Sequence, residues 1–300
     1  MTTPNDELRP ISFDDYIGQP KLKETLRIKI NSALIREEPL DHMLFSGPPG
    51  SGKTSLANVI ARQMDVNYFT QIMPMKKGLL PKLVSNFSGI VFFDEIHRCS
   101  VKEQEELLPL IEDGYLQLGS GRTIEANNLT ILAATTEKDK IIPPLYQRFF
   151  TPSFEEYSLE ELQMIAYGMG LKIGVSLDSD MSLVFAKASS GTPRNLKSMV
   201  YMYRDLTYLY DHITPEQVLD ACRITADGLT EDHILYLKTL KKLGGLAGID
   251  LIASQMQLNK ASVSLLEQHL IKQEFIAPTK SGRELLNKGY KKAGETNDFI

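Results

Sequence analysis

Short apolar runs and helix-spaced apolar positions alternate along the first half of this 300-residue chain. The apolar runs predict strands at residues 43–46, 66–70, 90–93, 129–134 and 151–154. Apolar positions at helical spacing predict helices at residues 21–36, 53–64 and 101–112. Strands that are apolar along their length and alternate with helices are typical of a parallel sheet with helices on both faces. We therefore predict an α/β domain over residues 1–156.

Strand patterns stop at Ser158, and only helical spacing continues as far as residue 226. Ser158 and Glu161 stand at the spacing of a capping box, in which side chains satisfy backbone N–H groups at a helix start. Thr214 and Pro215 mark another start, because proline suits the first position of a helix. The helices are predicted at residues 158–170, 178–189, 195–211 and 215–223. We expect residues 157–226 to form a small, all-helical lid domain.

A third pattern begins after Asp227-Gly228-Leu229. Helices are predicted at residues 230–243, 248–256 and 260–272, and a short strand from Phe275 then enters a Pro/Gly turn with two cations. Three helices followed by a basic hairpin are typical of a winged helix-turn-helix, although a helical bundle for protein contacts would show a similar pattern. We predict a winged-helix DNA-binding domain over residues 227–294. Residues 295–300 lack periodicity and are expected to form a flexible tail.

Composition and charge are those of an ordinary soluble protein. The chain has no run of about 18 apolar residues, so no transmembrane helix is predicted, and its N-terminus lacks the pattern of a secretory signal. Cys99 and Cys222 lie far apart without metal-ligand spacing, which favours a reduced, cytoplasmic protein with no membrane partner. The net charge is −5, but residues 227–294 hold ten Lys or Arg against seven Asp or Glu. This basic end is compatible with a DNA contact or with an ordinary solvated surface.

A phosphate-binding loop pattern, G-x-x-x-x-G-K-[ST], connects the predicted strand at 43–46 to the helix at 53–64. Its residues are Gly47, Pro48, Pro49, Gly50, Ser51, Gly52, Lys53 and Thr54, with Ser55 following in the helix. A glycine turn between a strand and a helix start points backbone N–H groups at one place, which suits the phosphates of ATP. We predict that Lys53 reaches the β- and γ-phosphates and that Thr54 ligates Mg²⁺.

Two adjacent carboxylates follow the apolar run at 90–93. Asp94 and Glu95 would emerge at the C-terminal end of a buried strand, where open α/β sheets bind their ligands. In this position Asp94 would hold the Mg²⁺ shell, and Glu95 would orient and polarise the attacking water. Together with the phosphate-binding loop, this pair predicts a nucleotide triphosphatase. His97 and His42 have no Cys or His partners at ligand spacing, so we interpret both as structural.

Three further polar positions are compatible with such a site. Thr136 follows the apolar run at 131–134, where its hydroxyl could contact the attacking water or simply cap the strand. Arg148 is predicted in a loop between the last two strands, and Arg194 opens a helix of the lid. Lone arginines are usually surface residues, but a triphosphatase needs additional positive charge on its transition state.

These motifs, in this order, resemble those of AAA+ ATPases and, more closely, those of the RuvB family of Holliday-junction branch-migration motors. The matching segments are Leu8-Arg9-Pro10, Tyr16-Ile17-Gly18-Gln19, Leu40-Asp41-His42, Gly47–Thr54, Asp94-Glu95-Ile96-His97-Arg98, Ala134-Thr135-Thr136, Arg148-Phe149, Gly191-Thr192-Pro193-Arg194, Asp227-Gly228-Leu229, Gly244-Gly245 and Gly282-Arg283. The resemblance covers roughly residues 8–292 and implies an AAA+ domain, a helical lid and a winged helix.

The resemblance also implies a role for several of these residues. Thr136 would be sensor 1, Arg194 would be sensor 2, and Arg148 would be a finger that enters the site of a neighbouring subunit. The residues that border the nucleotide would be Leu8, Arg9, Tyr16, Ile17 and Tyr157. ATP sites at subunit interfaces imply a homo-oligomeric ring, expected to be a hexamer. The winged helix would hold the duplex arms of branched DNA, with Lys280 and Arg283 as its DNA contacts.

Three segments depart from the family pattern. Tyr146 replaces an arginine that precedes Arg148 in the family, so one cation is lost. The wing reads Pro278-Thr279-Lys280-Ser281-Gly282-Arg283 in place of Arg-Thr-Pro-Arg-Gly-Arg, and fewer phosphate contacts predict weaker, less salt-sensitive DNA binding. The segment from Leu116 to Thr130 is shorter than the family's hairpin, which docks a RuvA-type junction-binding partner. It therefore stays open whether this chain works with a RuvA-type partner, with another adaptor or with none.

The sequence as a whole predicts an ATP hydrolase that drives DNA branch migration in recombination and repair. Two alternatives stay open. One is another AAA+ remodeller, such as a clamp-loader-like subunit, and the other is a DNA-bound regulator in which hydrolysis only resets a switch. A motor moves strands and is stimulated by DNA, whereas a switch binds DNA in one nucleotide state and moves nothing.

Overall fold

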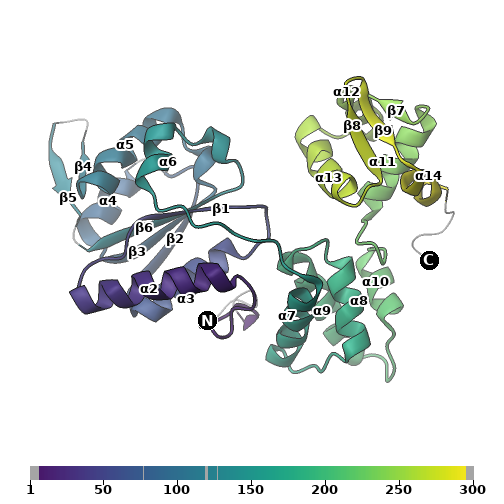
Figure 1. Cartoon of the computed structure of the whole chain (residues 1–300), viewed down its shortest axis with the longest axis horizontal. Coiled ribbons are helices and arrows are strands. Elements are labelled where there is room, and N and C mark those ends of the chain that lie inside the picture. The colour runs from purple at the N-terminus through teal and green to yellow at the C-terminus, as the bar shows by residue number, and fades with distance from the viewer. Residues whose placement is uncertain (1–6, 77, 119–120, 127, 295–300) are drawn as a thin grey trace. The chain divides into compact units, whose positions relative to one another are not determined.

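A computed structural model of the chain describes residues 7–76, 78–118, 121–126 and 128–294. The chain divides into two compact units (Figure 1). The first comprises Met1–Glu161 together with Thr192–Arg194, and the second comprises Leu162–Gly191 together with Asn195–Ile300. The second unit holds the predicted winged helix and the predicted lid except residues 157–161 and 192–194, which belong to the first unit. The boundary between lid and winged helix at residue 226 stays a prediction. The tail predicted at 295–300 lies outside the described residues.

The first unit is built on a parallel sheet with strand order β1-β6-β3-β2. Its strands are β1 (Met43–Ser46), β2 (Tyr68–Ile72), β3 (Gly89–Asp94) and β6 (Leu129–Thr135), and a separate antiparallel pair is formed by β4 (Tyr115–Gln117) and β5 (Thr123–Glu125). Its α-helices are α2 (Pro20–Arg36), α3 (Lys53–Met64), α4 (Leu79–Asn86), α5 (Val101–Glu112) and α6 (Pro143–Arg148), with 3₁₀ turns η1 (Ile96–Arg98) and η2 (Lys138–Lys140).

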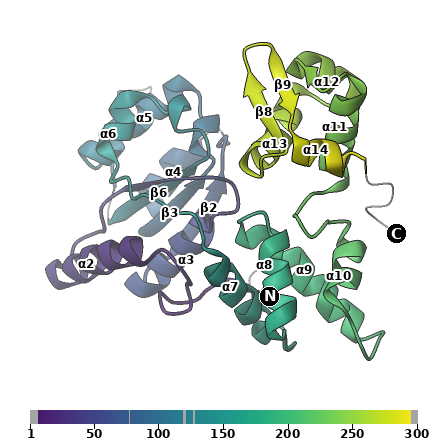
Figure 2. The same cartoon turned by 45° about the vertical axis from the view of Figure 1, so that its right-hand side comes forward.

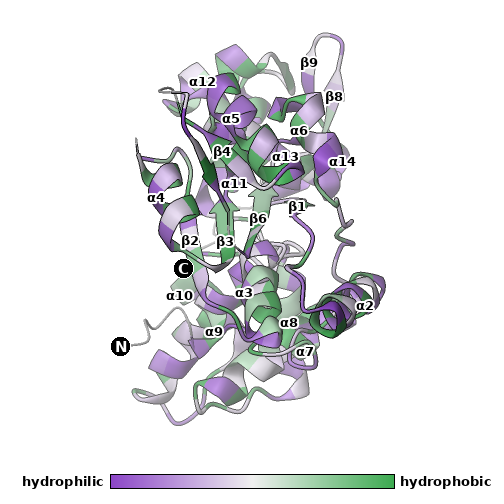
Figure 3. Cartoon of the chain, turned by 90° about the vertical axis from the view of Figure 1, so that its left-hand side faces the viewer, coloured by the Kyte–Doolittle hydropathy of each residue, from purple (hydrophilic) through white to green (hydrophobic). Residues whose placement is uncertain are grey.

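Residues of the central strands alternate between two apolar cores, because successive side chains of a strand point to opposite faces of the sheet. Ile90 and Phe92 of β3 pack with α2 and α3 on one face. Val91 and Phe93 pack with α4, α5 and α6 on the other face. Figure 1 shows these two helical layers, and Figure 3 shows β3 and β6 as hydrophobic strands. The prediction of a parallel sheet covered on both faces is therefore confirmed.

The structure corrects the sequence prediction at two places in this unit. Residues 151–154 do not form a strand, although isolated parallel bridges join Phe150 to Met43 and Ser153 to Ser46. Pro152 lies between these bridges and has no N–H to donate to a ladder. Arg148 does not lie in a loop, because it is the last residue of α6. That helix begins with Pro143, whose fixed φ suits a first helical position. Helix α4 was not predicted. Apart from Tyr115, the β4-β5 pair lies in the segment from Leu116 to Thr130, for which the resemblance implied a shortened hairpin.

The lid sequence forms four helices, as predicted. They are α7 (Leu159–Lys172), α8 (Ser179–Ala188), α9 (Pro193–Thr207) and α10 (Pro215–Cys222). The expected caps are present: the backbone N–H of Glu161 donates to Ser158 Oγ, and the N–H of Ser158 donates to Glu161 Oε2. Thr214 and Gln217 form a second capping box at the start of α10. Helix α9 ends at Thr207, four residues before its predicted end.

The last part of the chain has the winged-helix arrangement that was predicted (Figure 2). Its helices are α11 (Glu231–Lys242), α12 (Ile249–Met256), α13 (Lys260–Lys272) and α14 (Asn287–Lys292), and its strands are β7 (Leu246–Ala247), β8 (Ile276–Thr279) and β9 (Gly282–Leu285). The strands form an antiparallel sheet in the order β7-β9-β8. Strand β7 and helix α14 were not predicted. None of the helices in the described part of the chain is long and apolar enough to cross a lipid bilayer.

Candidate functional site

The phosphate-binding loop runs from β1 into α3, and two of its glycines adopt conformations that side chains disfavour. Gly50 has φ 80° and Gly52 has φ 92°, a left-handed region that L-residues rarely occupy. A Cβ atom at Gly52 would lie 2.5 Å from the Tyr16 hydroxyl oxygen, and one at Gly50 would lie 3.0 Å from Cβ of Arg194. The loop is therefore both sharply turned and closely covered, which restricts these two positions to glycine.

Lys53 occupies the first turn of α3 and is almost fully buried. Its Nζ donates to the carbonyl oxygens of Gly47 and Pro48, each at 2.8 Å. Burial lowers the pKa of Lys53, while the charges of Glu95 and Asp94 act in the opposite direction. The amine therefore lies inside the curve of the loop and bonds to neutral acceptors, where it can exchange them for the charged oxygens of a phosphate.

Thr54 and Asp94 are brought together where α3 begins and β3 ends. The Thr54 hydroxyl donates to Asp94 Oδ2 across 3.4 Å. The pKa of Asp94 is raised by burial and by the charge of Glu95, and is lowered by Lys53 and by the bond from Thr54. A hydroxyl and a carboxylate are ligands that suit Mg²⁺, which keeps several waters and binds through few protein groups. Among the described residues no cluster of three His, Cys, Asp or Glu offers a richer metal site.

Glu95 lies directly after β3, with its backbone in the left-handed region at φ 58°. Thr136 follows the neighbouring strand β6, and its hydroxyl donates to Glu95 Oε2 across 3.1 Å. The imidazole Nδ1 of His97 lies 3.2 Å from the same oxygen. The structure thus brings Glu95 and Thr136 together as predicted. It also places His97 against Glu95, a contact that the interpretation of His97 as structural missed.

Two tyrosines cover the outer side of the loop. The Tyr157 hydroxyl donates to the carbonyl oxygen of Ser51 across 3.2 Å and lies 3.2 Å from the Tyr16 hydroxyl. The Tyr16 hydroxyl lies 3.4 Å from the carbonyl oxygen of Gly52. Burial and the neighbouring Tyr157 raise the pKa of Tyr16 well above its usual value, so its hydroxyl stays a donor. Both tyrosines were predicted to border the nucleotide, and the structure places their hydroxyls against backbone carbonyls of the phosphate-binding loop.

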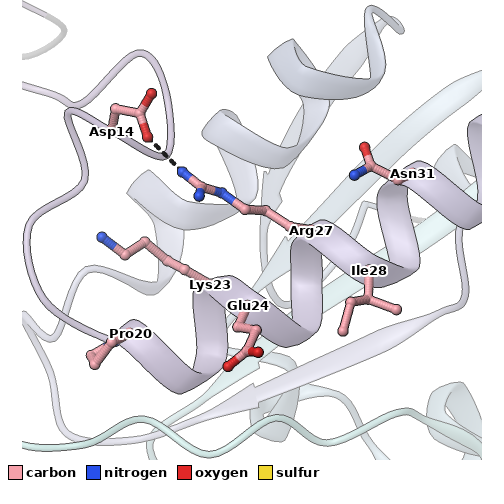
Figure 4. Close-up of a pocket in the computed structure, with 7 residues that line it drawn as sticks. All are labelled: Asp14, Pro20, Lys23, Glu24, Arg27, Ile28 and Asn31. Atoms are coloured by element: carbon pink, nitrogen blue, oxygen red, sulfur yellow. Dashed lines mark hydrogen bonds and ion pairs between the residues drawn. The ribbon is translucent and has the colours of Figure 1, made fainter.

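The segment that carries Tyr16 is held from two sides. Helix α2 contributes one side: Lys23 Nζ donates to the carbonyl oxygen of Tyr16 across 2.7 Å, and Arg27 pairs with Asp14. An open hollow on this helix, lined by Asp14, Pro20, Lys23, Glu24, Arg27, Ile28 and Asn31, is shown in Figure 4. On the other side, the buried side-chain amide of Gln19 bonds to both the N–H and the carbonyl of Glu155. These bonds tie the segments of Tyr16 and Tyr157 together.

In the winged helix, the two cations predicted to contact DNA differ in exposure and in pairing. Lys280 lies exposed in the turn between β8 and β9. Arg283 lies on β9 and donates from Nε and Nη2 to the two carboxylate oxygens of Glu267 on α13, each at 2.9 Å. The hydroxyl of Tyr236 on α11 donates to Glu267 Oε1 across 2.9 Å. Arg283, predicted as a DNA contact, is thus engaged by Glu267 within the chain, and this pair joins the wing to two helices.

Comparisons with known proteins agree with both halves of this description. Residues 8–153 match the family model of the Holliday junction DNA helicase RuvB P-loop domain, and residues 226–293 match that of the RuvB C-terminal winged helix domain. The chain is 36% identical over 297 residues to the Holliday junction branch migration complex subunit RuvB of Campylobacter concisus strain 13826, covering 92% of this chain and 88% of that protein. The chain belongs to the RuvB family. Its P-loop domain and winged helix are thereby those of a RuvB-type ATPase.

Solved structures of another RuvB protein have the same fold. The Thermotoga maritima RuvB Holliday junction branch migration motor is 30% identical, with a TM-score of 0.82, and the match covers 95% of this chain and 97% of that one. A single-residue variant of the same protein gives a TM-score of 0.83 over 94% of this chain and 97% of that one. The fold predicted from the resemblance is confirmed along nearly the whole chain.

The remaining residues predicted from the RuvB resemblance differ in how close they lie to the loop. Arg194 packs against Gly50 and lies near enough to Lys53 for its charge to lower the pKa of that amine. Leu8 is buried, Ile17 is half-buried, and Arg9 lies near Tyr68 of β2. Arg148 lies elsewhere on the unit: its Nε donates to Glu112 Oε2 across 2.6 Å, and its Nη1 donates to the carbonyl oxygen of Pro144.

Proposed function

We propose that this chain is an ATP-driven motor that moves the branch point of four-way DNA junctions, the activity named for its relatives. The observation that carries the proposal is a nucleotide site in which Lys53, Thr54, Asp94, Glu95 and Thr136 converge, in a chain that matches a RuvB protein over 92% of its length. The RuvB-type winged helix in the same chain would supply a surface for DNA. Recombination and repair are the processes that use such an activity.

The residues of the site divide the work of ATP hydrolysis. Bound Mg²⁺ would neutralise charge on the phosphates, with Thr54 and Asp94 as its protein ligands. Lys53 would exchange its bonds to the loop carbonyls for the β- and γ-phosphate oxygens. Glu95 would accept hydrogen bonds from the attacking water. Its Oε2 is held by Thr136, and no described residue donates a hydrogen bond to its Oε1. That oxygen is the one available to orient the water.

A homo-oligomeric ring, which we expect to be a hexamer, would complete this site with a cation from the next subunit. Arg148 supports this proposal because its contacts within the chain are with Glu112 and Pro144 rather than with Lys53 or Glu95. To act in a neighbouring site it must leave Glu112, a partly exposed ion pair of the kind worth only about 0–1 kcal/mol. Arg194 would contact the γ-phosphate from within the same chain.

The ring proposal predicts complementation between two inactive variants. Arginine fingers contribute on the order of 10³–10⁵ in rate in other nucleotidases. Arg148→Ala should therefore bind ATP and hydrolyse it poorly, and Lys53→Ala should lose binding. Mixing the two variants should restore part of the activity, because some interfaces would then combine an intact loop with an intact finger. Mixed rings that show no restored hydrolysis would place Arg148 outside the neighbouring site.

DNA contacts would come from the exposed cations of the winged helix. Lys280 at the wing tip is one, and Lys241 and Lys242 of α11 with Lys291 of α14 form a second exposed group on helices that pack together. Such contacts to phosphates are independent of sequence. Arg283 would act indirectly, by holding the wing against α13. A RuvA-type protein, if used, would dock on the β4-β5 hairpin of the P-loop domain.

One assay tests the proposed motor directly. A synthetic four-way junction with homologous arms is incubated with the chain and ATP, with and without a RuvA-type protein, and strand exchange is followed together with phosphate release. We expect both to occur with the wild-type chain and neither with Lys53→Ala. Hydrolysis without any movement of the junction, in both conditions, would replace the motor by an ATP-switched DNA-binding regulator.

A further inference from the structure

His97 is held in the nucleotide site by the way the chain leaves β3. The left-handed backbone at Glu95 turns the chain into η1, and this turn brings the imidazole of His97 back beside the end of β6. The side chain of His97 is only 7% exposed. A polar ring buried to this extent normally has hydrogen-bond partners for its nitrogens. The partners it has here are side chains of the site itself.

Both ring nitrogens of His97 face these side chains. Nδ1 lies 3.2 Å from Glu95 Oε2 and 3.1 Å from Thr135 Oγ1. Nε2 lies 3.1 Å from Glu137 Oε1. The imidazole therefore stands between two carboxylates, one of which is the group expected to orient the attacking water. Thr135 gives Nδ1 a second partner and also accepts the backbone N–H of Glu137.

Glu137 connects this arrangement to the open side of the site. Its side chain is 47% exposed, and its Oε2 accepts from Lys140 across 2.7 Å. The hydrogen bond from Lys140, together with the charge of that ammonium, lowers the pKa of Glu137, which keeps the carboxylate an acceptor for the ring. A hollow of about 530 Å³ beside the phosphate-binding loop is lined by Ser46, Gly47, Pro48, Thr136, Glu137, Lys138, Asp139 and Lys140. The imidazole thus joins Glu95 to the wall of this hollow.

We propose that His97 is a positioning residue for ATP hydrolysis. In the doubly protonated ring, in which both nitrogens donate, Nδ1 holds the Glu95 carboxylate and Nε2 is oriented by Glu137. Thr136 and His97 both contact the same oxygen of Glu95, and these two contacts restrict the orientation of the carboxylate. A displacement of about 1 Å at a reacting group can cost on the order of 10²-fold in rate. Removing the ring should therefore lower turnover without weakening the binding of nucleotide.

The test separates the two nitrogens of the ring, and it rests on the proposed ATPase activity. In His97→Asn the amide nitrogen takes the place of Nδ1, and in His97→Gln it takes the place of Nε2. We expect kcat to fall roughly 10–100-fold in His97→Ala, to recover largely in His97→Asn and to stay low in His97→Gln. The affinity for ADP, measured by calorimetry, should be unchanged in all three. His212→Asn, at an exposed histidine, is the control for loss of a histidine and should keep wild-type kcat.

Glu137 is tested by a matched pair of variants. Glu137→Gln keeps an oxygen that can accept from Nε2, whereas Glu137→Ala removes it. We expect the alanine variant to lose part of the turnover and the glutamine variant to keep most of it. Equal kcat in His97→Asn and His97→Gln, or a wild-type kcat in His97→Ala, would overturn the assignment of His97. A wild-type chain that hydrolyses no ATP would instead contradict the proposed function itself.

Discussion

Two groups of charged side chains, one in each unit, differ in how completely their members are paired. In the winged helix, Glu267 is 3% exposed and accepts three hydrogen bonds, two from Arg283 and one from Tyr236. In the nucleotide site, Lys53 bonds to neutral carbonyl oxygens, and Glu95 has an oxygen to which no described residue donates. The first group is satisfied by the chain itself, and the second is completed only by a ligand.

This difference gives a physical criterion for separating structure from chemistry in one protein. A buried carboxylate with all its donors in place has no capacity left for a substrate, and its removal leaves an uncompensated charge. A carboxylate that is fixed at one oxygen and open at the other is prepared for a reaction. Removing one charged side chain should therefore lower stability in the winged helix and turnover in the nucleotide site, and the predictions below test that separation.

The largest effect is expected at Glu95. Glu95→Gln keeps the shape and the bond from Thr136 but removes the charge that polarises the attacking water. A general base contributes about 10²–10⁴-fold, so we expect hydrolysis to fall by at least about 100-fold, with ATP binding and the unfolding midpoint unchanged. Steady-state hydrolysis, calorimetric binding and urea unfolding measure the three quantities. Turnover near the wild-type rate would remove Glu95 from the catalytic role.

The opposite pattern is expected at Arg283. Arg283→Ala leaves Glu267 buried without its main partner, which should destabilise the winged helix by about 3 kcal/mol. Arg283→Lys should recover only part of this, because an ammonium cannot make the two parallel bonds of a guanidinium. Hydrogen exchange of peptides from α11 and α13 in the full chain reports the stability of this domain. Exchange that matches the wild type in Arg283→Ala would show that the buried pair does not stabilise the fold.

A smaller effect separates the paired from the open cations of the winged helix. Each phosphate contact adds about 0.9 to the slope of log affinity against log salt on duplex DNA. Lys280→Ala should remove about one phosphate contact and lower the magnitude of this slope by about 0.9. The triple alanine variant of Lys241, Lys242 and Lys291 should remove up to about three contacts. Lys260 pairs with Asp250 in the same domain, so Lys260→Ala is the matched control and should leave the slope unchanged. If the slope stayed at its wild-type value in Lys280→Ala and in the triple variant, neither exposed group would contact the DNA phosphates.

The sequence could predict those features whose residues lie close together along the chain. The phosphate-binding loop, the two carboxylates after β3 and the helix caps are defined by residues a few positions apart, and the structure confirms their surroundings. The pair of Arg283 with Glu267 joins residues 16 positions apart on different elements, so neither the charge of Arg283 nor its match to the family's wing could show this contact. His97 was missed for the same reason, because Glu137 reaches it from the end of β6.

Short elements were also outside the reach of periodicity. Helix α6 has only six residues, and the strands β4 and β5 have three residues each. Helix α4 begins between Gly78 and Pro81, two residues that are typical of turns. Residues 151–154 are apolar enough to suggest a strand, yet Pro152 interrupts the ladder. In each case tertiary packing or a missing N–H decides the outcome, and a single stretch of sequence does not show it.

The smallest predicted effect is one that the two units share. His42 Nδ1 in the first unit accepts the backbone N–H of Ile131 across 2.8 Å, and His233 in the winged helix packs against the ring of His269. Burial lowers the pKa of His42 and of His233 to about 4. Because the folded-state values are depressed, the neutral rings contribute stability above the unfolded value of about 6.5 that is lost as the pH falls towards 4.

Between pH 7 and pH 6 each ring should therefore lower stability by roughly 0.5–1 kcal/mol. The measurement is hydrogen exchange under denaturant at several pH values, corrected for intrinsic exchange, on peptides from β6 and from α11. His42→Asn should flatten the pH dependence for β6 alone, and His233→Asn should flatten it for α11 alone. The two units would then differ in how their carboxylates are paired and agree in how their buried histidines respond to pH. A pH dependence of β6 that is unchanged in His42→Asn would assign it to other groups, and the similarity between the two units would not hold.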